Sequence, residues 1–191
     1  IDGLGSNLTE HLSIMRAKPK VELTHMSKTC EEKQLMWKKD DEEMILSALR
    51  SREHQTGTNC ERLEREFAKW NGNTYCAATN SGTAALHMGL AACGVSHGDH
   101  VIVPAYTWPS SATCVLHQGA APIFVDIDFA TMNMDVCKIE AAITSQTKAI
   151  IVVHLHGLAT EMSGVLEMAR KYDLAIIEDA CQAYGTMYDG V

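Results

Sequence analysis

Short apolar runs alternate with segments of helical pattern over most of this sequence, and this alternation restricts the possible folds more than any other feature. We expect strands at 75–78, 101–103, 122–125, 149–153 and 174–177. Strands that alternate strictly with helices form βαβ units and therefore a mostly parallel sheet. Because the runs are apolar throughout, helices should cover both faces of that sheet. The sequence thus predicts a three-layer α/β/α fold.

Helices are predicted where apolar residues recur at helical spacing. The predicted helices are 40–50, 60–70, 82–93, 108–118, 136–143 and 162–172. Residues 1–36 are weakly patterned and contain Gly3, Gly5 and Pro19, so we interpret them as an irregular N-terminal arm. Residues 37–191 are interpreted as the first part of a larger domain.

The composition argues against several functional classes. The 191 residues carry a formal net charge of −8, which disfavours nucleic-acid binding because phosphate groups would be repelled. No apolar run is long enough to span a bilayer and no signal peptide is visible, so we expect a cytoplasmic protein without a membrane partner. The seven cysteines are scattered and form no C-x-x-C pair, which argues against a disulfide framework and against a zinc site.

Ligands of parallel α/β sheets bind beyond the carboxyl ends of the strands. The segments that follow the predicted strands are unusually rich in polar and aromatic residues, and they are 79–83, 104–108, 126–128, 154–157 and 178–182. Candidate binding residues are therefore sought in these five segments.

The segment Asn80-Ser81-Gly82-Thr83 lies between a predicted strand and a predicted helix. The start of a helix offers unpaired backbone N–H groups, Gly82 allows an anion to approach, and Ser81 and Thr83 add hydroxyl donors. This pattern suits a phosphate cradle, although Ser81 could equally be only a helix N-cap. The segment is neither a Walker loop nor a G-x-G-x-x-G dinucleotide loop.

Two further residues suit a flat heteroaromatic cofactor. Trp108 opens a predicted helix and could stack on such a ring, although an aromatic residue there is also typical of a core. Asp179 follows a strongly apolar strand, where a carboxylate is costly unless it is paired. A protonated pyridine nitrogen would be a suitable partner, and the alternative is that Asp179 caps the next turn.

The neighbours of Asp179 and the histidine pair have simpler interpretations. Glu178 should point to the opposite side of the strand and be structural, whereas Gln182 could reach the same site as Asp179. His154 and His156 could form a metal pair, but no cluster of carboxylates or thiolates supports one. We interpret them as satisfied structural or substrate-side histidines, and we expect no metal site.

A series of motifs resembles one known family. The motifs are Thr79-Asn80-Ser81-Gly82-Thr83-Ala84-Ala85-Leu86, the segment 98–108 with Val103-Pro104-Ala105-Tyr106-Thr107-Trp108, Phe124-Val125-Asp126-Ile127-Asp128, Thr147-Lys148-Ala149-Ile150, Val153-His154-Leu155-His156-Gly157 and Ile177-Glu178-Asp179-Ala180-Cys181-Gln182-Ala183. Their order and spacing are similar to those of the DegT/DnrJ/EryC1/StrS aminotransferases, from about residue 40 to the end. The resemblance implies a fold-type-I enzyme that uses pyridoxal 5′-phosphate (PLP).

The resemblance also implies roles for individual residues. Ser81, Gly82 and Thr83 would hold the cofactor phosphate, and Trp108 would stack on the pyridine ring. Asp179 would pair with the ring nitrogen, and Gln182 would contact the 3-oxygen of the ring. Members of the family transfer an amino group from glutamate or glutamine to a keto sugar, usually nucleotide-linked, or to a cyclitol, and they form homodimers.

One departure from the family pattern is the absence of the lysine that forms the Schiff base with the cofactor. In the family this lysine lies further along, and no lysine of this sequence follows Asp179. We therefore interpret residues 37–191 as the N-terminal part of the PLP-binding large domain, without the small C-terminal domain and inactive alone. Three alternatives remain: a sugar dehydratase of the same family with histidine at the lysine position, a non-catalytic regulatory protein on the same fold, and an unrelated nucleotide-binding α/β domain.

Overall fold

The computed structural model describes residues 38–51 and 57–190. The chain divides into two units, Ile1–Leu63 and Glu64–Val191, and each is described by itself. The predicted arm at 1–36 lies outside the described residues, so its boundary with the rest of the chain stays a prediction. The first unit contains helix α3 (Lys39–Ser51), whose first turn is acidic and whose last turn carries Arg50, as the helix dipole favours. Helix α4 (Thr58–Trp70) spans the boundary between the units.

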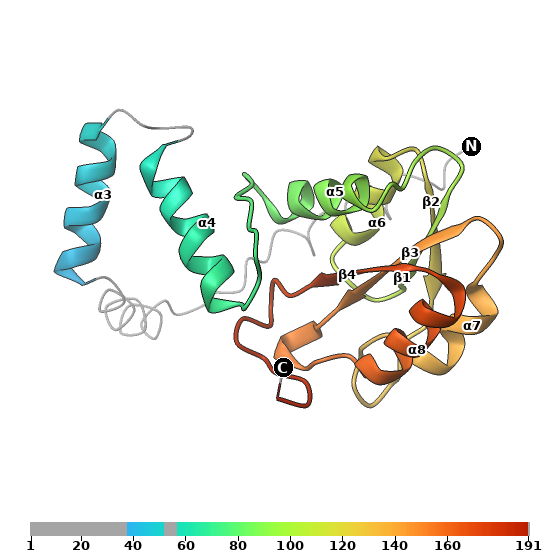
Figure 1. Ribbon diagram of the computed structural model, residues 1–191. Helices are drawn as coiled ribbons and strands as arrows, with labels where there is room; N and C mark the ends of the chain where they lie inside the picture. Colours follow the sequence, from blue (N-terminus) through green and yellow to red (C-terminus); the bar gives the residue numbers. More distant parts are fainter. Residues whose placement is uncertain (1–37, 52–56, 191) are drawn as a thin grey trace, which may run out of the picture. The chain divides into compact units, whose positions relative to one another are not determined.

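The second unit is built on a four-stranded parallel sheet (Figure 1). Its strands are β1 (His100–Pro104), β2 (Ala121–Val125), β3 (Thr147–Val153) and β4 (Ala175–Asp179). The strand order is β2-β1-β3-β4, and each neighbouring pair is parallel. The predicted parallel α/β fold is thereby confirmed.

Helices cover both faces of the sheet (Figure 1). Helices α5 (Gly82–Ala92) and α6 (Ser110–His117) pack on one face, and α7 (Ile139–Ala142) and α8 (Met162–Tyr172) pack on the other. Each face has its own core, because alternate residues of a strand point in opposite directions. Val101, Val103 and Ile151 belong to the core under α5 and α6, whereas Ile102 and Ile150 belong to the core under α7 and α8.

Three predicted elements differ from those observed. The prediction of a strand at 75–78 was wrong. This segment joins no sheet, and the N–H of Ala78 donates to Glu64 Oε1 at 2.8 Å. The helix predicted at 108–118 begins later, at Ser110, after Pro109 at the N-cap position. The helix predicted at 136–143 is divided into a 3₁₀ turn, η3 (Val136–Lys138), and the short helix α7. No helix in the described ranges is long and apolar enough to cross a membrane.

Candidate cofactor-binding site

The N-terminus of α5 lies beside the carboxyl end of β4. A Cβ atom built on Gly89 would lie 3.7 Å from the side chain of Ile177 in β4, so the helix packs along this strand. At the start of the helix, a Cβ atom on Gly82 would lie 3.3 Å from the Sγ atom of Cys181, which follows the same strand. Two sequence segments about 100 residues apart thus meet at the carboxyl end of the sheet.

The first turn of α5 is arranged to receive an anion. Ser81 is the N-cap residue, and its hydroxyl accepts a hydrogen bond from the N–H of Ala84 at 3.2 Å. No described residue accepts a hydrogen bond from the N–H groups of Gly82 and Thr83. Free N–H groups at a helix N-terminus carry a partial positive charge. Ser81 is therefore a helix cap, and this role is compatible with an anion beside it.

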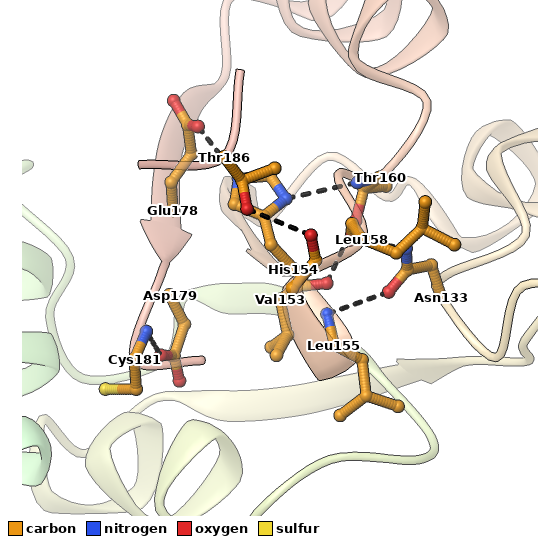
Figure 2. A network of polar contacts seen from close by, with 11 residues as sticks. Asn133, Val153, His154, Leu155, Leu158, Thr160, Glu178, Asp179, Cys181 and Thr186 are labelled. Carbon is orange, nitrogen blue, oxygen red and sulfur yellow. Dashed lines mark hydrogen bonds and ion pairs between the residues drawn. The ribbon is translucent and has the colours of Figure 1, made fainter. Parts of the chain in front are cut away.

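Asp179 is the last residue of β4 and is only 8% exposed. The N–H of Cys181 donates to its Oδ1 atom at 3.2 Å, so Asp179 also closes the turn that follows the strand (Figure 2). Within the described part of the chain, no lysine, arginine or histidine forms an ion pair with it. A buried carboxylate without a cationic partner is costly, so this position favours a positively charged ligand group.

Gln182 is fixed through its side-chain oxygen. The backbone N–H of His156 donates to Gln182 Oε1 at 2.8 Å. This bond assigns the orientation of the amide and leaves the side-chain nitrogen of Gln182 as a donor. His156 and Gly157 both adopt the left-handed conformation, with φ of 55° and 82°, and this turn brings the chain against Gln182. A Cβ atom on Gly157 would lie 3.4 Å from the carbonyl oxygen of Gln182.

His154 is a structural histidine, as one of the two sequence interpretations had it. Its ring accepts a hydrogen bond from the N–H of Thr160 at Nδ1 (3.1 Å), and Nε2 lies 3.0 Å from the carboxylate of Glu178 (Figure 2). Nδ1 therefore carries no proton, and Nε2 donates to Glu178. This hydrogen bond holds the pKa of Glu178 below its ordinary value, against the opposing effect of partial burial. Glu178 thus has a protein partner in His154, as the structural interpretation expects.

The connections after β3 and β4 are joined by further bonds that the sequence did not indicate. The N–H of His154 donates to the carbonyl of Asp179 at 3.1 Å. The side chain of Asn133 donates to the carbonyl of Leu158 at 2.9 Å and accepts from the N–H of Leu155 at 3.0 Å (Figure 2). Asn133 is buried, and more than twenty residues separate it from its partners, so no local sequence signal marks it.

Trp108 lies between β1 and α6 and is 75% exposed, which rules out the core interpretation. Its carbonyl oxygen accepts a hydrogen bond from the N–H of Ser111, so its backbone is fixed at the start of α6. No described aromatic ring stacks on it. The structure thus joins Gly82, Asp179 and Gln182 through the turn after β4, and it places Trp108 at the same end of the sheet with a free ring.

A cleft of about 670 Å³ lies elsewhere, on the side of the sheet covered by α7 and α8. Its lining includes Asp128, Met134, Leu158, Glu161 and Tyr188. None of the six predicted cofactor residues lines this cleft. In the described ranges, no three histidine, cysteine or acidic side chains are grouped as metal ligands would be. The buried carboxylate of Asp179, which no described cation pairs with, rather than this cleft, therefore defines the candidate site.

Comparison with known proteins identifies the family. The sequence model of the DegT/DnrJ/EryC1/StrS aminotransferase family matches residues 36–191. The chain belongs to this family. It is 45% identical over 130 residues to the L-glutamine:2-deoxy-scyllo-inosose aminotransferase of Streptomyces lividus, covering 68% of this chain and 31% of that protein. It is 47% identical over 128 residues to the GDP-perosamine synthase of Caulobacter vibrioides, covering 67% of this chain and 34% of that protein.

Solved structures of cofactor-dependent enzymes share the fold. NtdA from Bacillus subtilis, with the bound cofactor PMP, is 38% identical with a TM-score of 0.73, covering 80% of this chain and 36% of that chain. The E. coli GDP-4-keto-6-deoxy-D-mannose-3-dehydratase with bound hydrated PLP is 29% identical with a TM-score of 0.75, covering 81% of this chain and 41% of that chain. The predicted relation to fold-type-I PLP enzymes is thereby confirmed. The chain spans about a third of the length of the curated relatives it matches.

Proposed function

We propose that the complete protein uses PLP to transfer an amino group from glutamate or glutamine. The acceptor would be a nucleotide-linked keto sugar or a cyclitol. The observation that carries this proposal is Asp179, a buried carboxylate to which no described residue supplies a positive charge. Membership of the family and the names of the two curated relatives support the amino-transfer reaction.

The residues present fit PLP. The cofactor carries a phosphate and a pyridine nitrogen, and the site offers a helix N-terminus for the first and a carboxylate for the second. Ser81, Gly82 and Thr83 would hold the phosphate, and Trp108 would cover the ring. When bound, PLP supplies an electron sink that stabilises negative charge on the substrate carbon.

Asp179 and Gln182 would act on two different atoms of the ring. Asp179 would keep a proton on the pyridine nitrogen, because an adjacent carboxylate favours the charged form of a base. Gln182 would donate from its side-chain nitrogen to the 3-oxygen, since its side-chain oxygen is already bonded to the N–H of His156. Asp179 ends β4 and Gln182 lies in the turn after it, so both are attached to the same strand.

We further propose a cytoplasmic homodimer. Two aromatic side chains at or near this end of the sheet are exposed and have no role toward the cofactor in this proposal, and they are Tyr106 and Tyr184. Exposed aromatic residues are typical of surfaces that a partner covers. A second copy of the chain would cover them and supply substrate contacts.

The proposal is tested with the protein expressed from its complete reading frame. We expect it to gain visible absorbance on addition of PLP, and that absorbance to be lost when glutamine or glutamate is added without sugar. A keto sugar added next should restore the absorbance and gain an amino group, read by mass spectrometry. No absorbance gained with PLP would contradict the cofactor assignment.

The same assay distinguishes the second candidate, a sugar dehydratase, which the likeness to the E. coli dehydratase favours. A dehydratase would remove water from the sugar without adding nitrogen. The residue at the lysine position in the complete reading frame gives an independent answer, since lysine predicts amino transfer and histidine predicts dehydration.

A further inference from the structure

Cys181 occupies a position that the proposed cofactor site does not explain. It lies two residues after Asp179, in the turn that follows β4 (Figure 2), and its Sγ atom lies beside Gly82 in the first turn of α5. Its backbone N–H bonds to Asp179 Oδ1 at 3.2 Å. Its Sγ atom lies 3.3 Å from the position that a Cβ atom on Gly82 would take.

The cysteine therefore stands between the two parts of the site. One neighbour is the carboxylate proposed to pair with the ring nitrogen, and the other is the glycine proposed to admit the phosphate. The space beside Gly82 is filled by the sulfur, so a larger side chain on Cys181 would push against the helix. Any shift of this turn would change the separation between the carboxylate and the helix N-terminus.

The thiol also interacts with the carboxylate. A hydrogen bond between the thiol and Asp179 raises the pKa of Cys181, and partial burial and the negative charge of Asp179 raise it further. The thiol is therefore influenced by the Asp179 carboxylate, and the hydrogen bond that holds this carboxylate comes from the backbone N–H of Cys181.

We propose that Cys181 is a positioning residue, which fixes the Asp179 carboxylate at a set distance from the N-terminus of α5 so that one ligand can reach both. This proposal rests on the proposed function for its ligand. The backbone N–H of Cys181 orients the carboxylate, and the sulfur packed against Gly82 fixes the distance. Cys181 itself does not contact the reacting atoms.

The first test uses three variants of the complete protein, Cys181→Ala, Cys181→Ser and the control Cys93→Ala, an exposed cysteine at the end of α5. Pyridoxamine 5′-phosphate is the probe, because it reads the cradle without forming a bond to lysine. We expect Cys181→Ala to bind it roughly three- to tenfold more weakly, because the sulfur that packs between the turn and the start of the helix is removed. Cys181→Ser keeps a side chain of similar size and should recover most of the affinity, and Cys93→Ala should bind like the wild type.

The second test needs no cofactor. The rate of alkylation of Cys181 by iodoacetamide is measured against pH by mass spectrometry, in the wild type and in Asp179→Asn. Removing the carboxylate charge should move the pH profile to lower pH, because the thiolate forms more readily, whereas the profile of Cys93 should not move.

The two tests separate failure of this proposal from failure of the proposed function. A wild-type protein that binds no pyridoxamine phosphate contradicts the function, while the alkylation profiles still decide whether the thiol and the carboxylate interact. Equal probe affinity in Cys181→Ala and wild type, or identical alkylation profiles with and without Asp179, would overturn the positioning role.

Discussion

Glu178 and Asp179 are adjacent carboxylates with opposite surroundings. The side chain of Glu178 is 54% exposed and accepts a hydrogen bond from His154, whereas Asp179 is buried and, among the described residues, accepts one from the N–H of Cys181. Alternation along a strand predicts that the two side chains point in opposite directions. Alternation does not predict that Glu178 bonds to His154, which lies 24 residues earlier in the chain. That contact depends on the pairing of β3 with β4.

The bond between His154 and Glu178 predicts a small pH-dependent contribution to stability. The pKa of Glu178 is lowered in the folded state from an ordinary value of 4.5, so the contribution is present above pH 4.5 and is lost as the pH falls through the folded value. Glu178→Gln should therefore lower the free energy of unfolding at pH 7 by about 0.5 kcal/mol or less, because half-exposed pairs are screened. Chemical denaturation at pH 7 and pH 3.5 measures this difference.

Glu167→Gln is the matched control, because Glu167 is exposed on α8. Its effect on the free energy of unfolding should be the same at both pH values. A difference between wild type and Glu178→Gln that grows as the pH falls would contradict the assigned hydrogen bond.

Helix α5 shows which features of an element can be read from sequence. Its start at Gly82 was predicted from Ser81, a good N-cap residue, and its end lies within one residue of the prediction. The four apolar strands were predicted because valine and isoleucine mark buried parallel strands. The segment 75–78 was mistaken for a strand, because a short apolar run carries no information on whether a neighbouring strand exists to pair with it.

Other parts of the site depend on contacts between distant segments. Six candidate residues were named from local patterns and from the family resemblance, and the structure places five of them as helix-start or turn residues and Asp179 as the last residue of a strand. Neither source indicated the contact of Cys181 with Gly82, or the buried Asn133 that holds the loop after β3. These features arise only when the sheet order is known.

Alanine substitutions at two glycines of α5 should have separate effects, one on cofactor binding and the other on stability. Gly82→Ala should weaken binding of pyridoxamine phosphate to the complete protein roughly five- to tenfold, because the added methyl group displaces Cys181 at the helix N-terminus. Gly89→Ala is the control on the same helix, since its methyl group would make an ordinary contact with Ile177. It should leave the affinity unchanged and raise the free energy of unfolding by about 0.5–1 kcal/mol. Unchanged affinity in Gly82→Ala would argue against the cradle.

Alanine substitution of a third helical glycine, Gly164, should destabilise the protein, in contrast to Gly89→Ala. A Cβ atom on Gly164 in α8 would lie 2.5 Å from Cγ1 of Val136, a contact that the packing of α8 against η3 leaves no room for. Gly164→Ala should lower the free energy of unfolding of the complete protein by about 1–3 kcal/mol despite the better helix propensity of alanine. Chemical denaturation next to Gly89→Ala checks this, and stabilisation by both substitutions would contradict the observed packing.

At the scale of the whole molecule, one parallel sheet brings the binding residues together. Asp179 is the last residue of β4 and therefore lies at the carboxyl end of the sheet. Helix α5 packs along the same strand, with its N-terminus at that end. The anion-binding end of a helix and a buried carboxylate are thereby placed side by side, which suits a ligand with a phosphate and a basic ring nitrogen.

The most direct test of that claim is the affinity of the complete protein for pyridoxamine 5′-phosphate, compared between wild type, Asp179→Asn and Asp173→Asn. Asp173 is exposed and left-handed at the end of α8, a conformation that asparagine also adopts readily, so its substitution controls for the change of charge. We expect wild type and Asp173→Asn to bind alike, and Asp179→Asn to bind at least about tenfold more weakly, the effect of losing one charged partner. Equal affinity of Asp179→Asn and wild type would contradict the account.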